Sequence, residues 1–226
     1  MSRFGRWGRS VVRVPRRPTG PLRVLVIHAH PDPSSFNRAL ADAAVSSLGA
    51  GGHEVTFVDL YAEQFEPRMS EAERHAYEST TPILDEQVQR YADLVKSHDA
   101  LVFVYPTWWW GMPAMLKGFL ERVLVPGVSF VLDPASNKVV PGLSHIRLIV
   151  GISTYGSSRP AMLLFNDGGR RLVMRCVRVL APRMGCRTAW LGLYSIDRST
   201  PQQRAAFLQK VETFMGATAT KPGGAR

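Results

Sequence analysis

The sequence is poor in cysteine and has no long apolar run. Cys176 and Cys186 are the two cysteines among 226 residues, and one such pair suits neither a disulfide framework nor a zinc site. We interpret both as packing residues. No apolar run approaches the ~18 residues that a membrane-spanning helix needs, and no secretory apolar core is present. We therefore expect a soluble, cytoplasmic protein without a membrane span.

Acidic residues are missing from the first 20 positions, which hold six arginines. These arginines supply most of the net charge of +10, because removing their six charges leaves +4 for the remaining residues. Pro15 and Pro18 interrupt the segment and no helical period runs through it, so we predict that 1–20 is a disordered basic tail. An Arg-rich targeting segment and a nucleic-acid or membrane tether are two interpretations of this tail. We favour a third, in which it is an unstructured extension or results from an upstream start codon that was wrongly included.

Two classes of motif are also absent. The first apolar run is followed by no GxGxxG pattern and no Walker loop, so the usual nucleotide fingerprints are missing. The histidines form no HxxH or HExxH pair. Residues 29–32, AHPD, are similar to a motif of zinc-dependent N-deacetylases, but Pro33 stands where that family has a second Asp as a zinc ligand. Since three protein ligands cannot be assembled, we expect no metal site.

The segment 100–125 is the most informative part of the chain. An apolar run at 101–105 predicts a buried strand, Pro106-Thr107 predicts a turn, and residues 108–110 are all tryptophan. A helix is expected from Pro113, whose fixed φ suits a first helical position. Three indoles on a loop at the carboxyl end of a strand favour a ligand or another chain that covers them. Plain packing in the core or at a dimer face is the alternative.

Strands and helices are expected to alternate along the chain, which predicts an α/β protein with a parallel sheet. We predict strands at 22–29, 54–58, 101–105, 145–152 and 187–194, and helices at 36–48, 81–95, 113–124, 167–180 and 201–215. Thr81 is the expected N-cap of the second helix. A polar excursion precedes it, and 125–144 is expected to be a loop. We predict one domain over 21–216, with a five-stranded, doubly wound sheet in the order 2-1-3-4-5, and a frayed tail at 217–226.

In that strand order, the loops after strands one, three and four lie around one crevice. Ser34, Ser35 and Asn37 lie at the start of a helix, where free backbone N–H groups and hydroxyl donors suit a phosphate, and His30 could add a further donor or a positive charge. Capping of the helix by Ser34 or Ser35 is an equal alternative. The loop from Ser153 to Arg159 offers donors to the edge of a flat heterocycle. Tyr155 or Arg159 could stabilise negative charge on such a ring, and a plain polar turn is the alternative.

Together these loops resemble the flavodoxin-like NAD(P)H:quinone oxidoreductase family. The resemblance runs from about Leu22 to Tyr194 and rests on AHPDPSSFN, DLYAEQFEPRMSEAER, PTWWWGMPAMLKGFLERV and PGVSF, all in the family's order. It implies a flavodoxin-like fold and a bound flavin, FMN or FAD. Cofactor contacts are implied at His30, Ser34, Phe36 and Asn37 for the phosphates, at Pro106, Thr107, Trp109 and Trp110 for the ring, and at Ser153, Thr154 and Gly156 for its pyrimidine edge. Trp108 and Gly111 are included as further cofactor-binding residues. The family usually has a Gly-Gly pair where this chain has Tyr155-Gly156.

The resemblance also implies a function. NAD(P)H would reduce the flavin, which would pass two electrons to a quinone or similar flat acceptor, with Tyr155 and Arg159 as the catalytic side chains. Family members are commonly homodimers, which would give Trp108 a partner surface. We expect small-molecule partners and no nucleic acid. An electron carrier of the flavodoxin type, a regulatory flavoprotein of a transporter and, less favoured, a zinc deacetylase are the alternatives.

Overall fold

A computed structural model describes residues 20–133, 136, 138–182 and 184–218. Apart from Gly20, the predicted basic tail lies outside these residues, as does the C-terminal segment from residue 219. None of the helices formed by the described residues is both long and apolar enough to cross a membrane.

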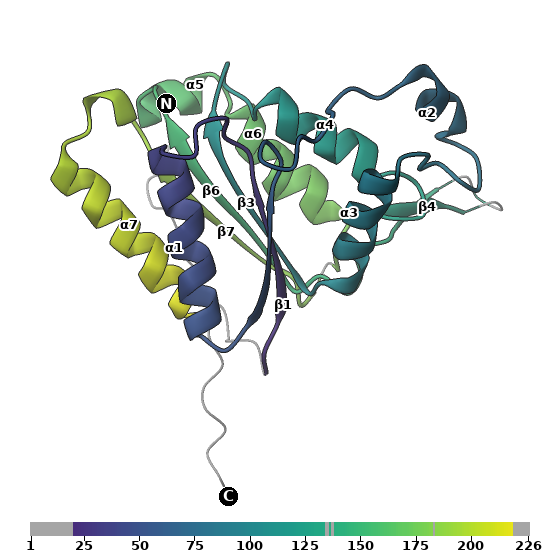
Figure 1. The fold of residues 1–226 in the computed structure, drawn as a ribbon, viewed down its shortest axis with the longest axis horizontal. Helices are drawn as coiled ribbons and strands as arrows, with labels where there is room; N and C mark the ends of the chain where they lie inside the picture. Colours follow the sequence, from purple (N-terminus) through teal and green to yellow (C-terminus); the bar gives the residue numbers. More distant parts are fainter. Residues whose placement is uncertain (1–19, 134–135, 137, 183, 219–226) are drawn as a thin grey trace, which may run out of the picture.

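Five parallel strands form the central sheet (Figure 1). They are β1 (Arg23–His28), β2 (Glu54–Asp59), β3 (Ala100–Thr107), β6 (Leu148–Tyr155) and β7 (Arg187–Leu193). Their order is β2-β1-β3-β6-β7, which confirms the predicted order 2-1-3-4-5 because the fourth and fifth strands of the sheet are β6 and β7. β3 and β6 are continuous buried runs, as expected for inner strands covered on both faces.

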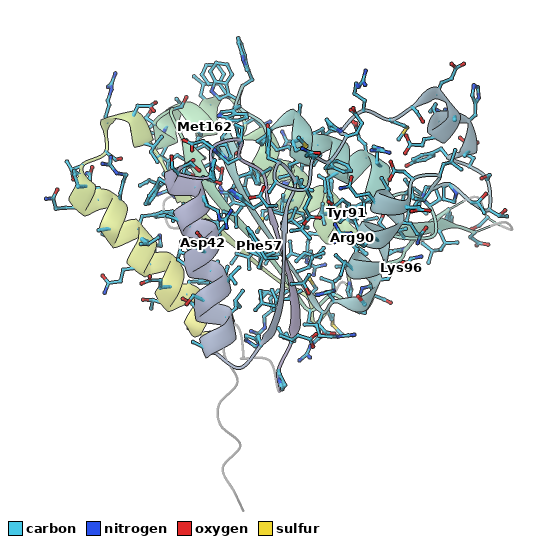
Figure 2. The ribbon with its side chains drawn as sticks, viewed as in Figure 1. Asp42, Phe57, Arg90, Tyr91, Lys96 and Met162 are labelled. Atoms are coloured by element: carbon cyan, nitrogen blue, oxygen red, sulfur yellow. The ribbon has the colours of Figure 1, made fainter. Side chains whose placement is uncertain are left out.

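Helices cover both faces of the sheet, as Figure 1 shows. One layer consists of α1 (Phe36–Ala50) and α7 (Pro201–Gly216). The other contains α3 (Glu86–Ser97), α4 (Ala114–Val123), α6 (Gly168–Arg171) and a π-helical turn, η1 (Leu172–Val177). Because side chains alternate along a strand, neighbouring residues such as Val24 and Leu25 enter the cores of opposite faces. The side chains in Figure 2 fill both layers.

Several predicted boundaries were wrong. The second predicted helix begins after Asp85, not Thr81, because the Asp85 carboxylate accepts hydrogen bonds from the N–H groups of Gln87 and Val88. Leu84, which falls within the predicted helix at 81–95, precedes the observed helix and is 55% exposed. The predicted loop at 125–144 contains two short antiparallel strands, β4 (Phe130–Leu132) and β5 (Val139–Pro141).

Other corrections concern the ends of strands and two cysteines. Pro106 and Thr107 continue β3 instead of forming a turn, and Pro106 is tolerated there because β1 pairs with β3 only as far as Val104. Similarly, residues 153–155 belong to β6, not to the loop after it. Cys186 is buried, but Cys176 is exposed and is not a packing residue.

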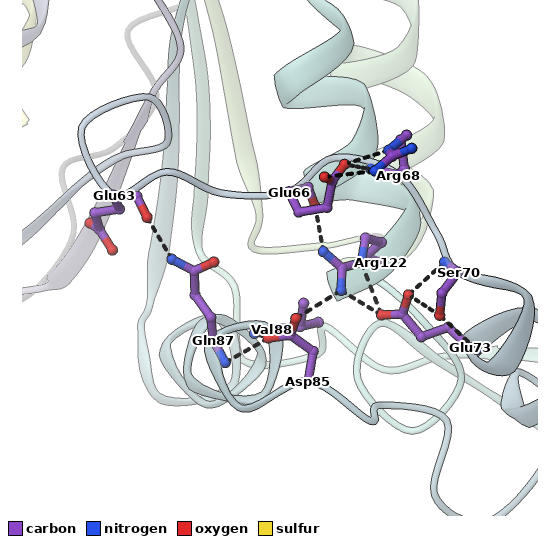
Figure 3. Close-up of polar contacts among 9 residues, drawn as sticks. All are labelled: Glu63, Glu66, Arg68, Ser70, Glu73, Asp85, Gln87, Val88 and Arg122. Atoms are coloured by element: carbon purple, nitrogen blue, oxygen red, sulfur yellow. Dashed lines mark hydrogen bonds and ion pairs between the residues drawn. The ribbon is translucent and has the colours of Figure 1, made fainter.

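The polar excursion is held against α4 by a buried ion network (Figure 3). It contains α2 (Glu71–Ala76), whose Ser70 and Glu73 form a complete capping box. Nε and one terminal nitrogen of Arg122 donate to Oε1 of Glu73 at 2.9 and 2.6 Å, and that nitrogen also donates to Asp85 at 3.1 Å. Arg122 also donates to the carbonyl of Glu66. Burial acts to raise the pKa of Glu73, but hydrogen bonds from Ser70 and Arg122 outweigh it and lower that pKa overall.

Gly118 allows the same excursion to approach α4 closely. A Cβ at this position would overlap Pro67, both its backbone and its side chain. A glycine inside a helix costs about 1 kcal/mol relative to alanine, so this close contact explains a residue that helix propensity disfavours.

Candidate functional site

Three loops meet at the carboxyl edge of the sheet, between β1, β3 and β6. The ring of His30, after β1, lies 5.8 Å from that of Trp108, after β3. The side-chain amide of Asn37, in the first turn of α1, donates to the Thr154 hydroxyl at 3.4 Å. The hydroxyls of Thr107 and Ser153 are 2.8 Å apart across β3 and β6. The convergence predicted from the strand order is therefore confirmed by direct contacts.

A cavity of about 260 Å³ opens at this edge. Its lining comes from the ends of β3 and β6 and the segments that follow them: Thr107, Trp109, Trp110, Tyr155, Gly156, Ser157 and Met162. Met162 belongs to α5 (Arg159–Leu164) and is labelled at this end of the molecule in Figure 2. A second, larger hollow lies along the outer face of α3, among side chains that include Glu86, Arg90 and Asp93. It contains none of the residues from the three converging loops.

The segment from Trp108 to Gly111, here called the tryptophan turn, is a tight turn with two central residues. Trp108 and Gly111 exchange both backbone hydrogen bonds, at 3.0 and 2.9 Å. The two residues between them, Trp109 and Trp110, have φ values of 48° and 54°. Such a turn normally carries Asn-Gly, and a left-handed conformation costs a residue with a Cβ about 1–2 kcal/mol. The turn is therefore strained at two consecutive positions beside the cavity.

The turn is held by the segment that enters α6. The N–H of Gly168 donates to the carbonyl of Trp110 at 3.0 Å, and the Phe165 ring packs 4.7 Å from the Trp110 ring. A Cβ on Gly169 would lie 2.9 Å from the Tyr105 hydroxyl. Trp109, in contrast, is 92% exposed, and its ring meets the edge of the Trp110 ring at 6.2 Å between centroids.

Tyr155 lines the cavity, but its hydroxyl is hydrogen-bonded to the buried carboxylate of Asp167. The hydroxyl donates to Oδ2 of Asp167 at 2.9 Å, and the ring stacks on Tyr194 with centroids 4.5 Å apart. Burial, followed by the nearby Asp167 charge, raises the pKa of Tyr155. Burial also raises the pKa of Asp167, against the opposing effect of hydrogen bonds from Arg170 and Tyr155.

The start of α1 differs from the predicted phosphate seat in one respect. Ser35 is the N-cap, accepting from the N–H of Arg38, while Ser34 donates its hydroxyl and its N–H to the Asp32 carboxylate. The N–H of Asp32 donates to Nδ1 of His30 at 3.0 Å, and the same nitrogen lies 3.2 Å from the Asp32 carbonyl oxygen. No acidic residue lies in the first turn of the helix itself.

Buried polar atoms without a partner lie close to this edge. They include Oδ1 of Asn37, Nε2 of His28 and the Tyr105 hydroxyl. Burial lowers the pKa of His28, although the Asp59 charge opposes this, so the ring is neutral at pH 7. Among the described residues, no three His, Cys, Asp or Glu side chains are grouped so that they could hold a metal ion.

Most of the predicted site residues lie together at this edge. Phe36 begins α1, Pro106 lies in β3, and Gly111 closes the tryptophan turn, while Arg159 is the first residue of α5. Sequence analysis included Ser157 only as a member of the loop from Ser153 to Arg159, and it missed Met162 and Asp167. The string Asn166-Asp167-Gly168-Gly169 is a turn signal that could have drawn attention to this approach.

These features match a known family. A model of the flavodoxin-like fold matches residues 22–162. The chain belongs to this flavodoxin-like family. Its fold resembles that of Smu.1420 from Streptococcus mutans UA159, with 28% identity, a TM-score of 0.74 and coverage of 86% of this chain and 98% of that one. It also resembles an NAD(P)H:quinone oxidoreductase from Methanothermobacter marburgensis, with 24% identity, a TM-score of 0.73 and coverage of 87% and 98%.

Sequence relatives in this family include oxidoreductases. NAD(P)H dehydrogenase [quinone] 1 of Rattus norvegicus is 27% identical over 83% of this chain and 74% of its own length. An uncharacterized NAD(P)H oxidoreductase of Haemophilus influenzae is 38% identical over 59% of this chain and 64% of its own length. The match to the Pongo abelii ribosyldihydronicotinamide dehydrogenase [quinone] spans about half of that relative, 53%. These matches confirm the family resemblance seen in the sequence.

Proposed function

We propose that this chain is a flavin-dependent oxidoreductase that passes two electrons from NAD(P)H to a quinone or a similar flat acceptor. The observation that carries the proposal is the aromatic-walled cavity at the carboxyl ends of β3 and β6, which is where ligands bind in doubly wound sheets. The names of the relatives favour the same activity.

The residues around the cavity fit a flavin. Trp109 and Trp110 supply aromatic surface for a flat ring. The unpartnered Oδ1 of Asn37 is a buried acceptor at the start of α1, and α1 directs its N-terminus to this edge. A structural neighbour with 16% identity and a TM-score of 0.70, an FMN-dependent NADH-azoreductase of Bacillus anthracis, is described in complex with FMN. FMN and FAD both remain candidates for this chain.

We assign the ring to the slot between the tryptophan turn and the end of β6. When bound, the flavin supplies the ring that accepts a hydride and later releases it. Trp109 and Trp110 would exclude water from one side, and Gly156 and Ser157 would present backbone groups to its polar edge. The hydrogen bond between the hydroxyls of Thr107 and Ser153 would hold the ends of β3 and β6 together beneath the ring. Arg159 is the better candidate to stabilise negative charge, because the proton of Tyr155 is already donated to Asp167.

The phosphate end is assigned to the N-terminus of α1. Nε2 of His30 and the N–H groups of the first turn would donate to it. Ser34 would have to exchange the Asp32 carboxylate for the phosphate. Because Asp32 carries a negative charge beside this position, we expect removal of that charge to tighten phosphate binding.

The tryptophan turn also favours association of two chains. Trp108, Trp109 and Trp110 are 41%, 92% and 38% exposed, and exposed aromatic area of this kind is typical of interfaces. We propose a cytoplasmic homodimer in which residues 21–216 form the flavin-binding domain and the partner covers part of this turn.

The proposal is tested on the purified protein. We expect bound flavin to be visible in its absorption spectrum, or to be retained after reconstitution with FMN or FAD and desalting. Folded protein that stays colourless after both reconstitutions would contradict the proposal. Sedimentation of the same sample gives the oligomeric state.

Steady-state rates test the reaction. One slot can stack one flat substrate at a time, so NAD(P)H and the quinone should alternate in a ping-pong reaction and give parallel double-reciprocal lines. Intersecting lines would indicate a ternary complex. Semiquinone as the main product would instead favour the one-electron carrier.

A further inference from the structure

Backbone strain is concentrated around the cavity. Six non-glycine residues of the described chain have positive φ: Gln64, Trp109, Trp110, Asn166, Asp167 and Ser195. All but Gln64 belong to segments that border the cavity: Ser195 donates its N–H to the carbonyl of Ser157, and Asn166-Asp167 directly precedes Gly168, which binds the tryptophan turn. Left-handed residues with side chains persist where the surrounding contacts over-determine them. The contacts made by Asp167 show how this is achieved.

Asp167 links three different walls of the cavity. Its carboxylate oxygen Oδ2 accepts from the Tyr155 hydroxyl at 2.9 Å. Its own N–H donates to the carbonyl of Met162 at 3.1 Å. The next N–H along the chain, that of Gly168, donates to the carbonyl of Trp110 at 3.0 Å. Tyr155, Met162 and Trp110 all line the cavity, and they come from β6, α5 and the tryptophan turn.

The side chain of Asp167 is restrained by burial and by hydrogen bonds to both carboxylate oxygens. The residue is 8% exposed, and its second oxygen, Oδ1, accepts from the N–H of Arg170 as the N-cap of α6. Each oxygen therefore has a fixed donor. Its φ of 30° is outside the usual range for a residue with a Cβ, so both the backbone and the carboxylate are committed to one geometry.

We propose that Asp167 is a positioning residue for the cofactor cavity. Its carboxylate holds Tyr155 directly, and its backbone places Gly168 so that the Gly168 N–H holds the Trp110 wall. Asp167 does not touch the cofactor. The inference rests on the proposed function for its ligand, but the arrangement of the walls is a property of the protein alone. The alternative to this proposal is that Asp167 serves only as the N-cap of α6.

A matched pair of N-cap variants separates these alternatives. Asp167→Ala removes the cap of α6 and the Tyr155 contact, whereas Thr200→Ala removes the cap of α7, where Thr200 and Gln203 form a capping box and Thr200 does not line the cavity. Asp167→Asn keeps an acceptor for Arg170 and can donate to the Tyr155 oxygen through Nδ2. Dissociation constants for FMN and FAD are measured by flavin fluorescence, and thermal midpoints are measured on the same samples.

We expect Asp167→Ala to weaken flavin binding at least about 10-fold, which corresponds to about 1.4 kcal/mol. Asp167→Asn should stay within about 3-fold of the wild type and Thr200→Ala within about 2-fold. Equal dissociation constants for Asp167→Ala and Thr200→Ala would overturn the proposal. If Asp167→Ala does not fold, Tyr155→Phe decides the matter. It keeps the ring and the cap but removes the bond, and unchanged flavin binding in this variant would overturn the proposal.

A second readout needs no flavin. Since Trp110 is held through Gly168, Asp167→Ala should change the near-ultraviolet circular dichroism and tryptophan emission of the apoprotein, and Thr200→Ala should not. Unchanged spectra in Asp167→Ala would overturn the inference. A wild-type protein that binds no flavin, with spectra that respond as expected, would instead contradict the proposed function and leave the positioning role of Asp167 supported.

Discussion

The ion network around Arg122, here called the clamp, and the edge of the sheet that borders the cavity, here called the cavity edge, treat buried polar groups in opposite ways. In the clamp, a buried guanidinium meets Glu73, Asp85 and a backbone carbonyl, so every buried charge has a partner (Figure 3). At the cavity edge, Asn37 and Tyr105 leave buried polar atoms unpartnered, and the tryptophan turn is strained. One region is optimised for stability and the other is not.

This difference favours separate roles for the two regions, one in stability and the other in ligand binding. Proteins break local rules mainly at functional sites and compensate elsewhere. The clamp fixes a long excursion that has few core residues of its own, and it stabilises α4, which follows the tryptophan turn in the chain. We therefore expect variants of the clamp to change stability, and variants of the edge to change ligand binding.

The largest effect is expected for Arg122→Ala. Breaking a buried ion pair costs about 3–5 kcal/mol, because a carboxylate is left buried without its partner. Urea denaturation should show this loss in the free energy of unfolding, while the flavin dissociation constant of the folded fraction changes little. Lys117→Ala is the matched control on the same helix. It breaks the exposed pair with Glu121 and should cost less than about 0.5 kcal/mol. A comparable loss in both variants would show that the buried network contributes no special stability.

Trp109→Gly should have the reverse pattern. Relief of the left-handed strain is worth about 1–2 kcal/mol, and the extra freedom of glycine in the unfolded chain offsets about 0.5–1 kcal/mol. Since the indole is 92% exposed in the single chain, little packing within the chain is lost, so the unliganded chain should be more stable by about 0.5–1 kcal/mol. Flavin retention should fall, because an aromatic wall is removed.

Gln64→Gly is the control for this variant. Gln64 has a φ of 52° and is exposed in the excursion, away from the cavity. It should also gain stability but leave flavin binding unchanged. Loss of stability in Trp109→Gly would show that the turn is not strained in solution.

The fold was predictable from the sequence where one signal dominates. Apolar runs such as 101–105 mark strands because buried parallel strands need apolar residues on both faces, and the strand order brought the three loops together. The start of α3 was not predictable, because Thr81-Pro82 has good local capping chemistry, whereas Asp85 is preferred through its tertiary contact with Arg122. Tertiary contacts override local propensity in such cases.

The site was predictable only at the level of its loops. Three consecutive tryptophans identify the loop after β3, but no sequence rule places two of them in left-handed conformations, which glycine and asparagine usually occupy. Asp167 was missed for a related reason. Its carboxylate binds the Tyr155 hydroxyl, and the N–H of the next residue, Gly168, binds the carbonyl of Trp110. Tyr155 and Trp110 lie 12 and 57 positions before Asp167 along the chain, so only the folded structure shows that this segment joins both walls.

The smallest effects, and the sharpest form of the comparison, are expected from two buried carboxylates as the pH falls. Glu73 has a lowered pKa in the folded protein, so its ionised form stabilises the fold above its unfolded pKa, and this stabilisation is lost as the pH falls through the folded value. Asp167 has a raised pKa, so its ionised form is a cost at neutral pH, which disappears on acidification. The ionisable groups facing Asp167 are Tyr105, Tyr155, Tyr194 and Arg170.

Glu73→Gln should therefore be less stable than the wild type at neutral pH, and Asp167→Asn should be equally or more stable. Both differences should shrink between about pH 7 and about pH 3, a range that brackets the ordinary carboxyl pKa of about 4. Urea midpoints of the three proteins across this range measure the two differences with opposite signs. Two differences of the same sign would show that the clamp and the cavity edge handle buried charge alike, and the contrast between them would then rest on strain alone.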